Sequence, residues 1–165
     1  MSQSESTERS DENEQQIRHA ETVEIRSRND RASGGVSHLV NISTAMHNTG
    51  LSNDELKNCV AEFRVDLYED GMELLPAPLF VGDIGDVRGR ETWKNVTPTS
   101  ERNDGTPTGF QMTIPDSAIE ALGYEKNSCT GELIDVYVGD QLLAFQRPLQ
   151  GEFTVDVPAG VEVGN

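Results

Sequence analysis

A chain of 165 residues has room for one compact domain, or for two very small ones with tails. Only 35% of the residues are hydrophobic, and the sequence contains no run of about 18 apolar residues, which excludes a membrane-spanning helix. The N-terminal stretch MSQSESTERSDENEQQ lacks the apolar centre of a secretion signal, so we expect a cytoplasmic protein.

The charge is strongly acidic: 29 acidic residues oppose 13 basic ones, and the net charge is −16. Few of the basic residues are lysines, and a lysine-poor acidic surface keeps a protein hydrated in molar salt. We therefore interpret the composition as adaptation to a salt-accumulating halophile, the alternative being an ordinary acidic protein with solvated charged faces. Cys59 and Cys129 are too few for a disulfide framework or a four-ligand zinc site, and we expect free thiols.

The first elements of the chain are a tail and a hairpin. Residues 1–20 are polar and acidic, a composition that predicts a disordered tail. Residues 22–28 alternate Val23 and Ile25 with charged neighbours, which predicts a half-buried strand. After a glycine-containing loop, residues 36–43 are predicted to return as a second strand and close the hairpin.

A second hairpin is predicted after a weak helix over residues 44–51 and a polar or helical turn over residues 53–58. Residues 61–75 contain two alternating runs on either side of Glu69-Asp70-Gly71. Asp-Gly between such runs is a strong hairpin signal. Residues 79–89 contain three glycines and are predicted to connect the two halves of the chain.

The second half begins with a predicted strand over residues 91–102, in which Trp93 is expected to be buried, and a polar loop over residues 103–109. A further strand is expected to end at Ile114-Pro115. The last residues, 150–165, contain the alternating segment FTVDV, which could add one edge strand.

A short helix and another hairpin complete this half. Asp116 follows a proline and is expected to accept hydrogen bonds from the free backbone N–H groups of the first helical turn. Gly123 is expected to end the helix, because glycine adopts the left-handed conformation without a Cβ clash. Two strands are then predicted to turn at Gly139-Asp140.

The two halves match each other at an offset of 70 to 72 residues. VNIS at 40–43, a short helix and FRVDLYEDGMELLPAP at 63–78 correspond to MTIP at 112–115, a short helix and IDVYVGDQLLAFQRP at 134–148. Self-similarity at a fixed spacing indicates that the structural unit is shorter than the chain.

Four short segments of the second half carry a family resemblance: Thr113-Ile114-Pro115, Ala121-Leu122-Gly123, residues 132–138 and residues 142–148. Their arrangement resembles the AbrB/MazE/SpoVT family of small DNA-binding proteins. The resemblance implies a unit in which a strand ending in Ile-Pro precedes a short helix and a hairpin. It also implies that two such units interleave into a swapped-hairpin barrel.

We therefore predict an α+β fold, a swapped-hairpin β-barrel formed as a pseudo-dimer of two ββαββ repeats in one chain. The predicted organisation is a disordered acidic tail 1–20, a first repeat 21–78, a linker 79–90, a second repeat 91–148 and a C-terminal extension 149–165. The predicted core consists of large apolar residues from both repeats: Val23, Ile25, Val40, Ile42, Phe63, Val65, Leu67, Ile114, Ile134, Val136, Val138 and Phe145.

Basic residues are concentrated in the opening hairpin of each repeat. Three arginines oppose two acidic residues between Thr22 and His47, four basic residues oppose three acidic ones between Arg88 and Met112, and the remainder of the chain carries −18. The resemblance implies that these hairpins contact double-stranded DNA, and arginine suits the task because its planar fork bridges two acceptors on guanine or clamps a phosphate. The predicted DNA-binding residues are Arg26, Arg28, Arg31, Arg88, Arg90, Lys94 and Arg102.

The leading prediction is thus a DNA-binding transcriptional regulator, and two alternatives stay open. One is an antitoxin in which the acidic tail or residues 150–165 mask a toxin. The other is a protein–protein interaction module that keeps the barrel but has lost DNA binding, which the negative charge and the presence of Ser43 at the place of Pro115 favour. Pairing of the whole chain with a second copy also stays open.

Neither an enzyme nor a cofactor or metal site is predicted. His19, His38 and His47 have no second ligand or nucleophile at a diagnostic spacing. The glycines at 34–35 and 82–85 lack the flanking elements and the lysine of a phosphate-binding loop.

Overall fold

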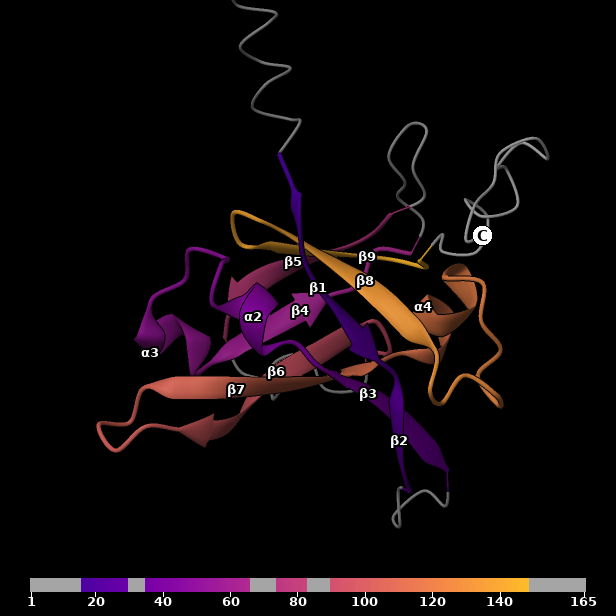
Figure 1. Cartoon of the computed structure of the whole chain (residues 1–165), viewed down its shortest axis with the longest axis horizontal. Helices are drawn as coiled ribbons and strands as arrows, with labels where there is room; N and C mark the ends of the chain where they lie inside the picture. The colour runs from indigo at the N-terminus through magenta and orange to yellow at the C-terminus, as the bar shows by residue number, and fades with distance from the viewer. Residues whose placement is uncertain (1–15, 30–34, 66–73, 83–89, 149–165) are drawn as a thin grey trace, which may run out of the picture.

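The structure is a computed structural model that describes residues 16–29, 35–65, 74–82 and 90–148. These residues form a mostly antiparallel sheet with three short helices (Figure 1). The elements are β1 (Arg18–Glu24), β2 (Arg26–Asn29), β3 (Val36–Asn41), α2 (Ser43–Met46), α3 (Asn53–Leu56), β4 (Cys59–Glu62), β5 (Leu75–Val81), β6 (Trp93–Glu101), β7 (Pro107–Ile114), α4 (Asp116–Ala121), β8 (Leu133–Gly139) and β9 (Leu142–Gln146).

The sheet rolls into a nearly closed barrel. Its strand order is β1-β8-β9-β5-β4-β6-β7-β3-β2, and every neighbouring pair is antiparallel. The first and last strands of this order are separated by Ile25 alone, so one long strand pairs with β8 before Ile25 and with β3 after it. The N–H of Ile25 donates to the carbonyl of Glu132, and the N–H of Gly131 donates to the carbonyl of Ile25, each at 2.8 Å. This change of partner brings the two ends of the sheet together.

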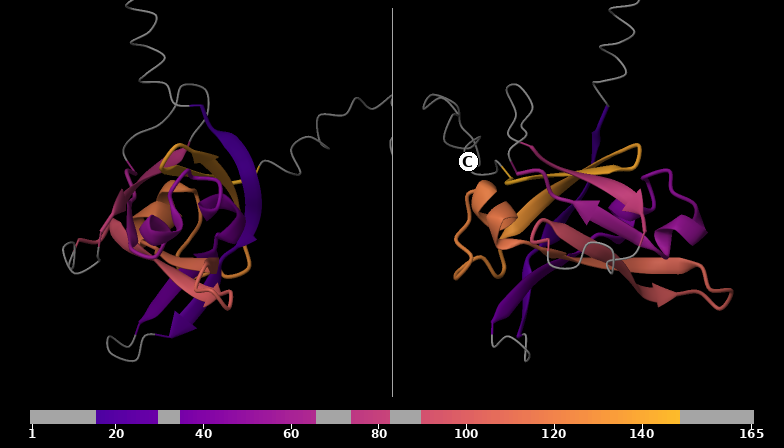
Figure 2. Two further views of the ribbon diagram at one scale, coloured as in Figure 1. Left: turned by 90° about the vertical axis from the view of Figure 1, so that its left-hand side faces the viewer. Right: turned by 180° about the vertical axis from the view of Figure 1, so that it is seen from behind.

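Hairpins from the two halves of the chain alternate around the barrel (Figure 2). The first half supplies β1/β2–β3 and β4–β5, and the second half supplies β6–β7 and β8–β9. Four ladders, β3·β7, β6·β4, β5·β9 and β8·β1, each join a strand of one half to a strand of the other. The two halves are therefore intertwined, and each hairpin is flanked by hairpins of the other half.

The barrel interior explains the alternating sequence patterns. In β7, for example, Phe110, Met112 and Ile114 are each at most 2% exposed, while the residues between them are partly exposed. Of the predicted core residues, Val65 is partly buried against the core and Leu67 lies outside the described residues. The other ten are buried: Val23, Ile25, Val40, Ile42, Phe63, Ile114, Ile134, Val136, Val138 and Phe145.

Several predicted boundaries are wrong because pairing with distant strands extends the elements. β1 begins at Arg18, so residues 18–20 belong to a strand rather than to a disordered tail; residues 1–15 lie outside the described part. Arg18 faces Val138 in the β1–β8 ladder, and this partner keeps a polar segment extended. β5 likewise continues to Val81, inside the predicted linker, because its last residues pair with β4.

The turns and helices also differ in detail from the predictions. The β8–β9 turn lies at Asp140-Gln141, one residue later than predicted, since Gly139 pairs with Leu142. The helix predicted over 44–51 is a single turn, α2. The predicted turn at 69–71 lies outside the described residues.

The N-termini of α2 and α4 are capped from other elements, whereas α3 is capped locally by Ser52 and Glu55. Asp116 was predicted to cap α4, but no side chain of the N-cap residue does so, and Asp116 instead lies 3.7 Å from the Nζ of Lys126. The Glu91 carboxylate, before β6, accepts hydrogen bonds from the N–H and the hydroxyl of Ser117, at 3.4 and 2.9 Å. Negative charge at this end of a helix is favourable, because the first N–H groups have no partner inside the helix.

The same device occurs in the first half, where Glu21 on β1 accepts a 2.7 Å hydrogen bond from the N–H of Ala45 in α2. We expect Glu21→Ala to lower the free energy of unfolding by about 1 kcal/mol, because it removes a charged acceptor from a part-buried helix end. Glu24→Ala, an exposed change of the same type on the same strand, is the matched control and should cost less than about 0.5 kcal/mol. Equal shifts of the two denaturation midpoints would contradict a capping role.

Candidate nucleic-acid interface

Two two-stranded ribbons extend beyond the barrel. Among the described strands β2 pairs only with β3, and the two form the first ribbon. The β3–β7 ladder starts at His38, so residues 28–29 and 35–37 lie beyond it, whereas Arg26 and Ser27 face Leu39 and His38 at its start. The β4–β6 ladder ends at Val96, and residues 97–109 form a second ribbon from β6 and β7. In Figure 1 the first ribbon points down and to the right, and the second lies at the lower left and points to the left; β5 and β9 lie at the top of the same view.

The first ribbon carries exposed arginines. All four residues of β2 are exposed, and Arg26 and Arg28 face Leu39 and Ser37 of β3. Residues two apart on a strand point to the same side, roughly 6.6 Å from each other along the strand. Neither guanidinium forms an ion pair with a carboxylate of the described residues. The two arginines are therefore free to contact an anionic partner together.

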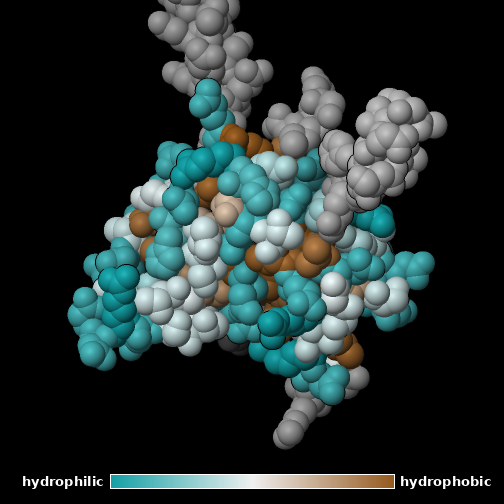
Figure 3. Space-filling model, viewed as in Figure 1, coloured by the Kyte–Doolittle hydropathy of each residue, from teal (hydrophilic) through white to brown (hydrophobic). Residues whose placement is uncertain are grey.

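The second ribbon ends in a tight polar turn. Its tip is held by Gly105 at φ +88° and by Asp104, whose carboxylate accepts a 3.0 Å hydrogen bond from the N–H of Thr106; this hydrogen bonding lowers the pKa of Asp104. Arg102 is exposed at the start of the turn, next to the exposed Glu101. The surface of this tip is hydrophilic, whereas apolar surface gathers near the middle of the same face, beside β8 and α4 (Figure 3).

Two predicted contact residues lie away from the ribbons. Lys94 is half-buried near the start of β6, opposite Ala61 of β4. Arg102 lies eight positions later, which corresponds to roughly 26 Å along an extended strand. The guanidinium of Arg90 lies 5.6 Å from the ring centre of Trp93. Trp93 is itself half-buried rather than buried as predicted, because it stacks outside the barrel on Phe80, with 5.4 Å between ring centres.

Thus Arg26 and Arg28 lie together on one ribbon and Arg102 on the other, while Arg31 and Arg88 lie outside the described residues. Lys57 was not among the predicted contact residues. It follows α3, and its Nζ lies 3.9 Å from the place that a Cβ on Gly105 would occupy, at the tip of the second ribbon. No sequence pattern signals this neighbour, because only the tertiary fold brings α3 to that tip.

The acidity of the chain is unevenly distributed. The described residues contain ten basic and fourteen acidic side chains, a net charge of −4, so −12 of the total of −16 belongs to residues 1–15, 30–34, 66–73, 83–89 and 149–165. The barrel with its ribbons is therefore much closer to neutral than the composition of the whole chain suggests.

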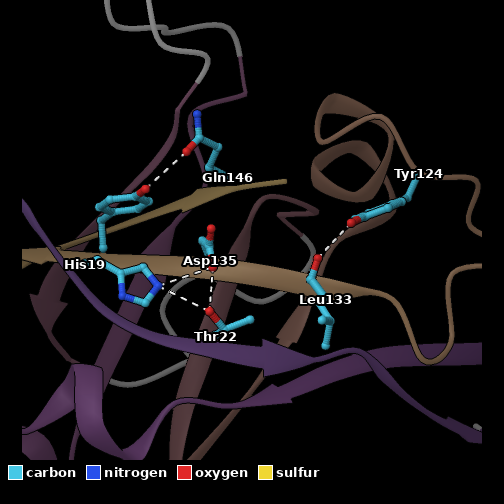
Figure 4. A network of polar contacts seen from close by, with 7 residues as sticks. His19, Thr22, Tyr124, Leu133, Asp135 and Gln146 are labelled. Carbon is cyan, nitrogen blue, oxygen red and sulfur yellow. Dashed lines mark hydrogen bonds and ion pairs between the residues drawn. The ribbon is translucent and has the colours of Figure 1, made fainter. Parts of the chain in front are cut away.

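A polar cluster ties β1 to β8 (Figure 4). His19 Nε2 lies 3.2 Å from both Thr22 Oγ1 and Asp135 Oδ1, and the Thr22 hydroxyl donates to the same carboxylate at 2.5 Å. In a catalytic triad the hydroxyl is hydrogen-bonded to one nitrogen of the histidine ring and the carboxylate to the other. Here both contact the same nitrogen, and the arrangement is a structural cross-link. Within the described part of the chain, His, Cys, Asp and Glu form no group of three that could hold a metal ion.

The two cysteines are buried free thiols, as predicted. Burial, with a smaller contribution from the Glu55 carboxylate, raises the pKa of Cys59 from its ordinary 9.0 to about 12. Burial also raises the pKa of Cys129. Thiols act as nucleophiles through the thiolate, so both are poor candidates for reactive groups at neutral pH.

Because the pKa of Cys59 is raised, we expect the protein to lose stability in alkali. The folded state holds the proton of this thiol more tightly than the unfolded state does. The stabilisation that results is therefore fully present below pH 9 and is lost as the pH rises towards 12. We expect the free energy of unfolding to fall over this range by up to about 1.4 kcal/mol per pH unit. Urea titrations of the wild type and of Cys59→Ala measure the effect, and the slope against pH should be shallower in the variant. Identical slopes would assign the alkaline loss to other groups.

Comparison with known proteins gives no match: no family model, no curated protein and no solved structure is significantly similar to this chain. None of the helices among the described residues combines the length and the apolar character needed to cross a bilayer.

Proposed function

We propose that this chain is a DNA-binding transcriptional regulator of the AbrB-like type, a swapped-hairpin barrel made as a pseudo-dimer of two ββαββ repeats. The observation that carries the proposal is the pair of two-stranded ribbons that extend beyond the ladders of the barrel, the first of which presents Arg26 and Arg28 without an ionic partner among the described residues. The major groove of B-DNA is about 12 Å wide and admits a two-stranded β-ribbon.

The register of the ladders supports the pseudo-dimer. Val40 faces Met112, which is 72 positions later, and Leu75 faces Phe145, which is 70 positions later. These separations equal the offset at which the two halves of the sequence match. In a two-fold symmetric pair, equivalent residues meet each other where the strands cross the axis. Two such meeting points, on two different ladders, are what an internal two-fold axis through the barrel requires.

The helix caps give independent support. The carboxylates of Glu21 and Glu91, 70 positions apart, each accept from a backbone N–H in the first turn of the following helix. The donors, Ala45 and Ser117, are 72 positions apart. A long-range contact that recurs at the repeat offset is expected of two copies of one unit.

Affinity would have to come from close contacts. In molar salt the Debye length is about 3 Å, so counterion release and distant charge contribute little. Screening also limits the repulsion between DNA and the acidic remainder of the chain. Guanidinium groups that touch base edges or phosphates directly, and the 53% exposed Val36 on the same ribbon, are suited to this condition.

Fluorescence anisotropy with labelled genomic duplexes in molar KCl tests the proposal. We expect the unaltered chain to bind and the double variant Arg26→Ala, Arg28→Ala to bind at least about 100-fold more weakly, since each arginine contact to a base is worth about 1–3 kcal/mol. Lys126→Ala, which removes an exposed basic residue near α4, is the matched control and should bind like the wild type. Equal affinities of the double variant and the control, with circular dichroism unchanged, would reject the first ribbon as the binding surface.

A protein–protein interaction module is the second candidate, and one surface feature favours it. Phe80 and Val81 are 40% and 55% exposed at the end of β5, and Phe80 stacks on Trp93. Aromatic residues with a neighbouring arginine, here Arg90, are typical of protein interfaces. A folded chain that retains no duplex at any salt concentration would favour this candidate over DNA binding.

A further inference from the structure

The two ribbons occupy equivalent places in the barrel. Leu39 on β3 and Gln111 on β7 are 72 positions apart, and they face Arg26 and Thr97. Ile25 and Val96, which immediately precede Arg26 and Thr97, are both buried, at 0% and 1% exposure. Arg26 of the first ribbon and Thr97 of the second therefore hold corresponding positions at the points where the ribbons leave the barrel.

Their chemistry differs at these positions. The first ribbon has Arg26 and Arg28, and no acidic side chain is present among its described residues. The second ribbon has Thr97 in place of Arg26, and its register shifts after Pro98, where Ser100 and Thr108 share a 2.8 Å hydrogen bond.

The charges on the described parts of the two ribbons differ as well. On the second ribbon Arg102 and the adjoining Lys57 are balanced by two exposed carboxylates, Glu101 and Asp104. The described part of the first ribbon thus has a net charge of +2, whereas the second ribbon together with Lys57 has a net charge of zero.

We propose that the two ribbons read a DNA duplex unequally, so that this chain recognises a site without two-fold symmetry and binds it in one orientation. Symmetric dimers select palindromic sites because both halves present the same groups. Here the first ribbon presents two guanidinium groups suited to guanine edges, and the second presents hydroxyls and balanced charge suited to contacts with the backbone. The inference rests on the proposed DNA-binding function and states the class of site that it takes.

Selection from a pool of random-sequence duplexes by the full chain in molar KCl tests the inference. We expect an enriched sequence with one strongly determined, guanine-containing half and one weakly determined half. Arg26→Thr with Arg28→Thr should weaken binding to that sequence about 100-fold, and Arg102→Ala less than about fivefold. Thr97→Arg, which places an arginine at the position equivalent to Arg26, should shift the selected sequences towards inverted repeats.

Arg26→Lys keeps the charge and the fold but loses the planar fork, so it should lower the preference for guanine at one position more than the overall affinity. This readout separates base contact from a structural effect of the double variant. Retention of no duplex by the unaltered chain would overturn the proposed function and the inference with it. A palindromic selected sequence, or equal losses from the two ribbons in folded variants, would overturn the inference and leave DNA binding intact.

Discussion

If the chain is divided between Gly82 and Arg90 into two peptides, we expect each peptide to remain unfolded on its own and the two to fold when they are mixed in equal amounts. Among the described strands, each of the four ladders between hairpins joins one half of the chain to the other. Each half alone would hold two hairpins with no neighbour, and isolated hairpins are marginal in water. Large side chains that meet across these contacts, such as Val40 and Met112, would lie exposed.

Circular dichroism and thermal unfolding of the two peptides, alone and mixed, measure this result. We expect no cooperative transition from either peptide and a single transition from the mixture. The matched control is the full chain cleaved in the same segment after folding, which should keep its transition because the barrel contacts are unchanged. Cooperative unfolding of either half alone would show that the intertwined contacts are not required for folding.

Phe145→Ala is expected to lower the free energy of unfolding by about 3–5 kcal/mol. Phe145 is 0% exposed and faces Leu75 in the β5–β9 ladder, and the centre of its ring lies 5.3 Å from the centre of the Phe63 ring. It is therefore part of the contact that holds the second half of the chain to the first. A loss of this size is a large fraction of the 5–15 kcal/mol by which domains are ordinarily stable.

Urea denaturation measures the loss, and Phe80→Ala is the matched control, since it makes the same change at a 40% exposed position on the neighbouring strand. The control should cost about 1 kcal/mol or less. Combining Phe145→Ala with Phe63→Ala should cost less than the sum of the single changes, because the two rings share one contact. Comparable costs for Phe145→Ala and Phe80→Ala would contradict the placement of Phe145 at the centre of the barrel.

Much of the element order was predictable because it depends on local signals. The alternation of Phe110, Met112 and Ile114 with polar residues identifies β7 and its buried face, as the structure has them. Gly123, at φ +90°, ends α4 as predicted, since a left-handed residue without a Cβ costs little. These features lie within a few residues of their cause.

The errors have the opposite origin. Arg18 belongs to a strand because Val138, 120 positions later, supplies its partner. The first turn of α4 is capped by Glu91 rather than by the adjacent Asp116, since the fold brings β6 and its preceding residues to that helix. The same holds for Lys57, which lies at the tip of the second ribbon. No pattern in a short window of sequence records such neighbours.

The amino-acid sequence by itself determined the order of strands and helices, most of the buried residues, and the presence of arginines on the first hairpin. The tertiary structure decided which hairpins lie side by side, and it grouped Arg26 and Arg28 on one ribbon while leaving Lys94 in the wall of the barrel. The physical reason is that the period of a strand fixes which side chains share a face, whereas the choice of neighbouring strands depends on burying those faces against segments far away in the chain.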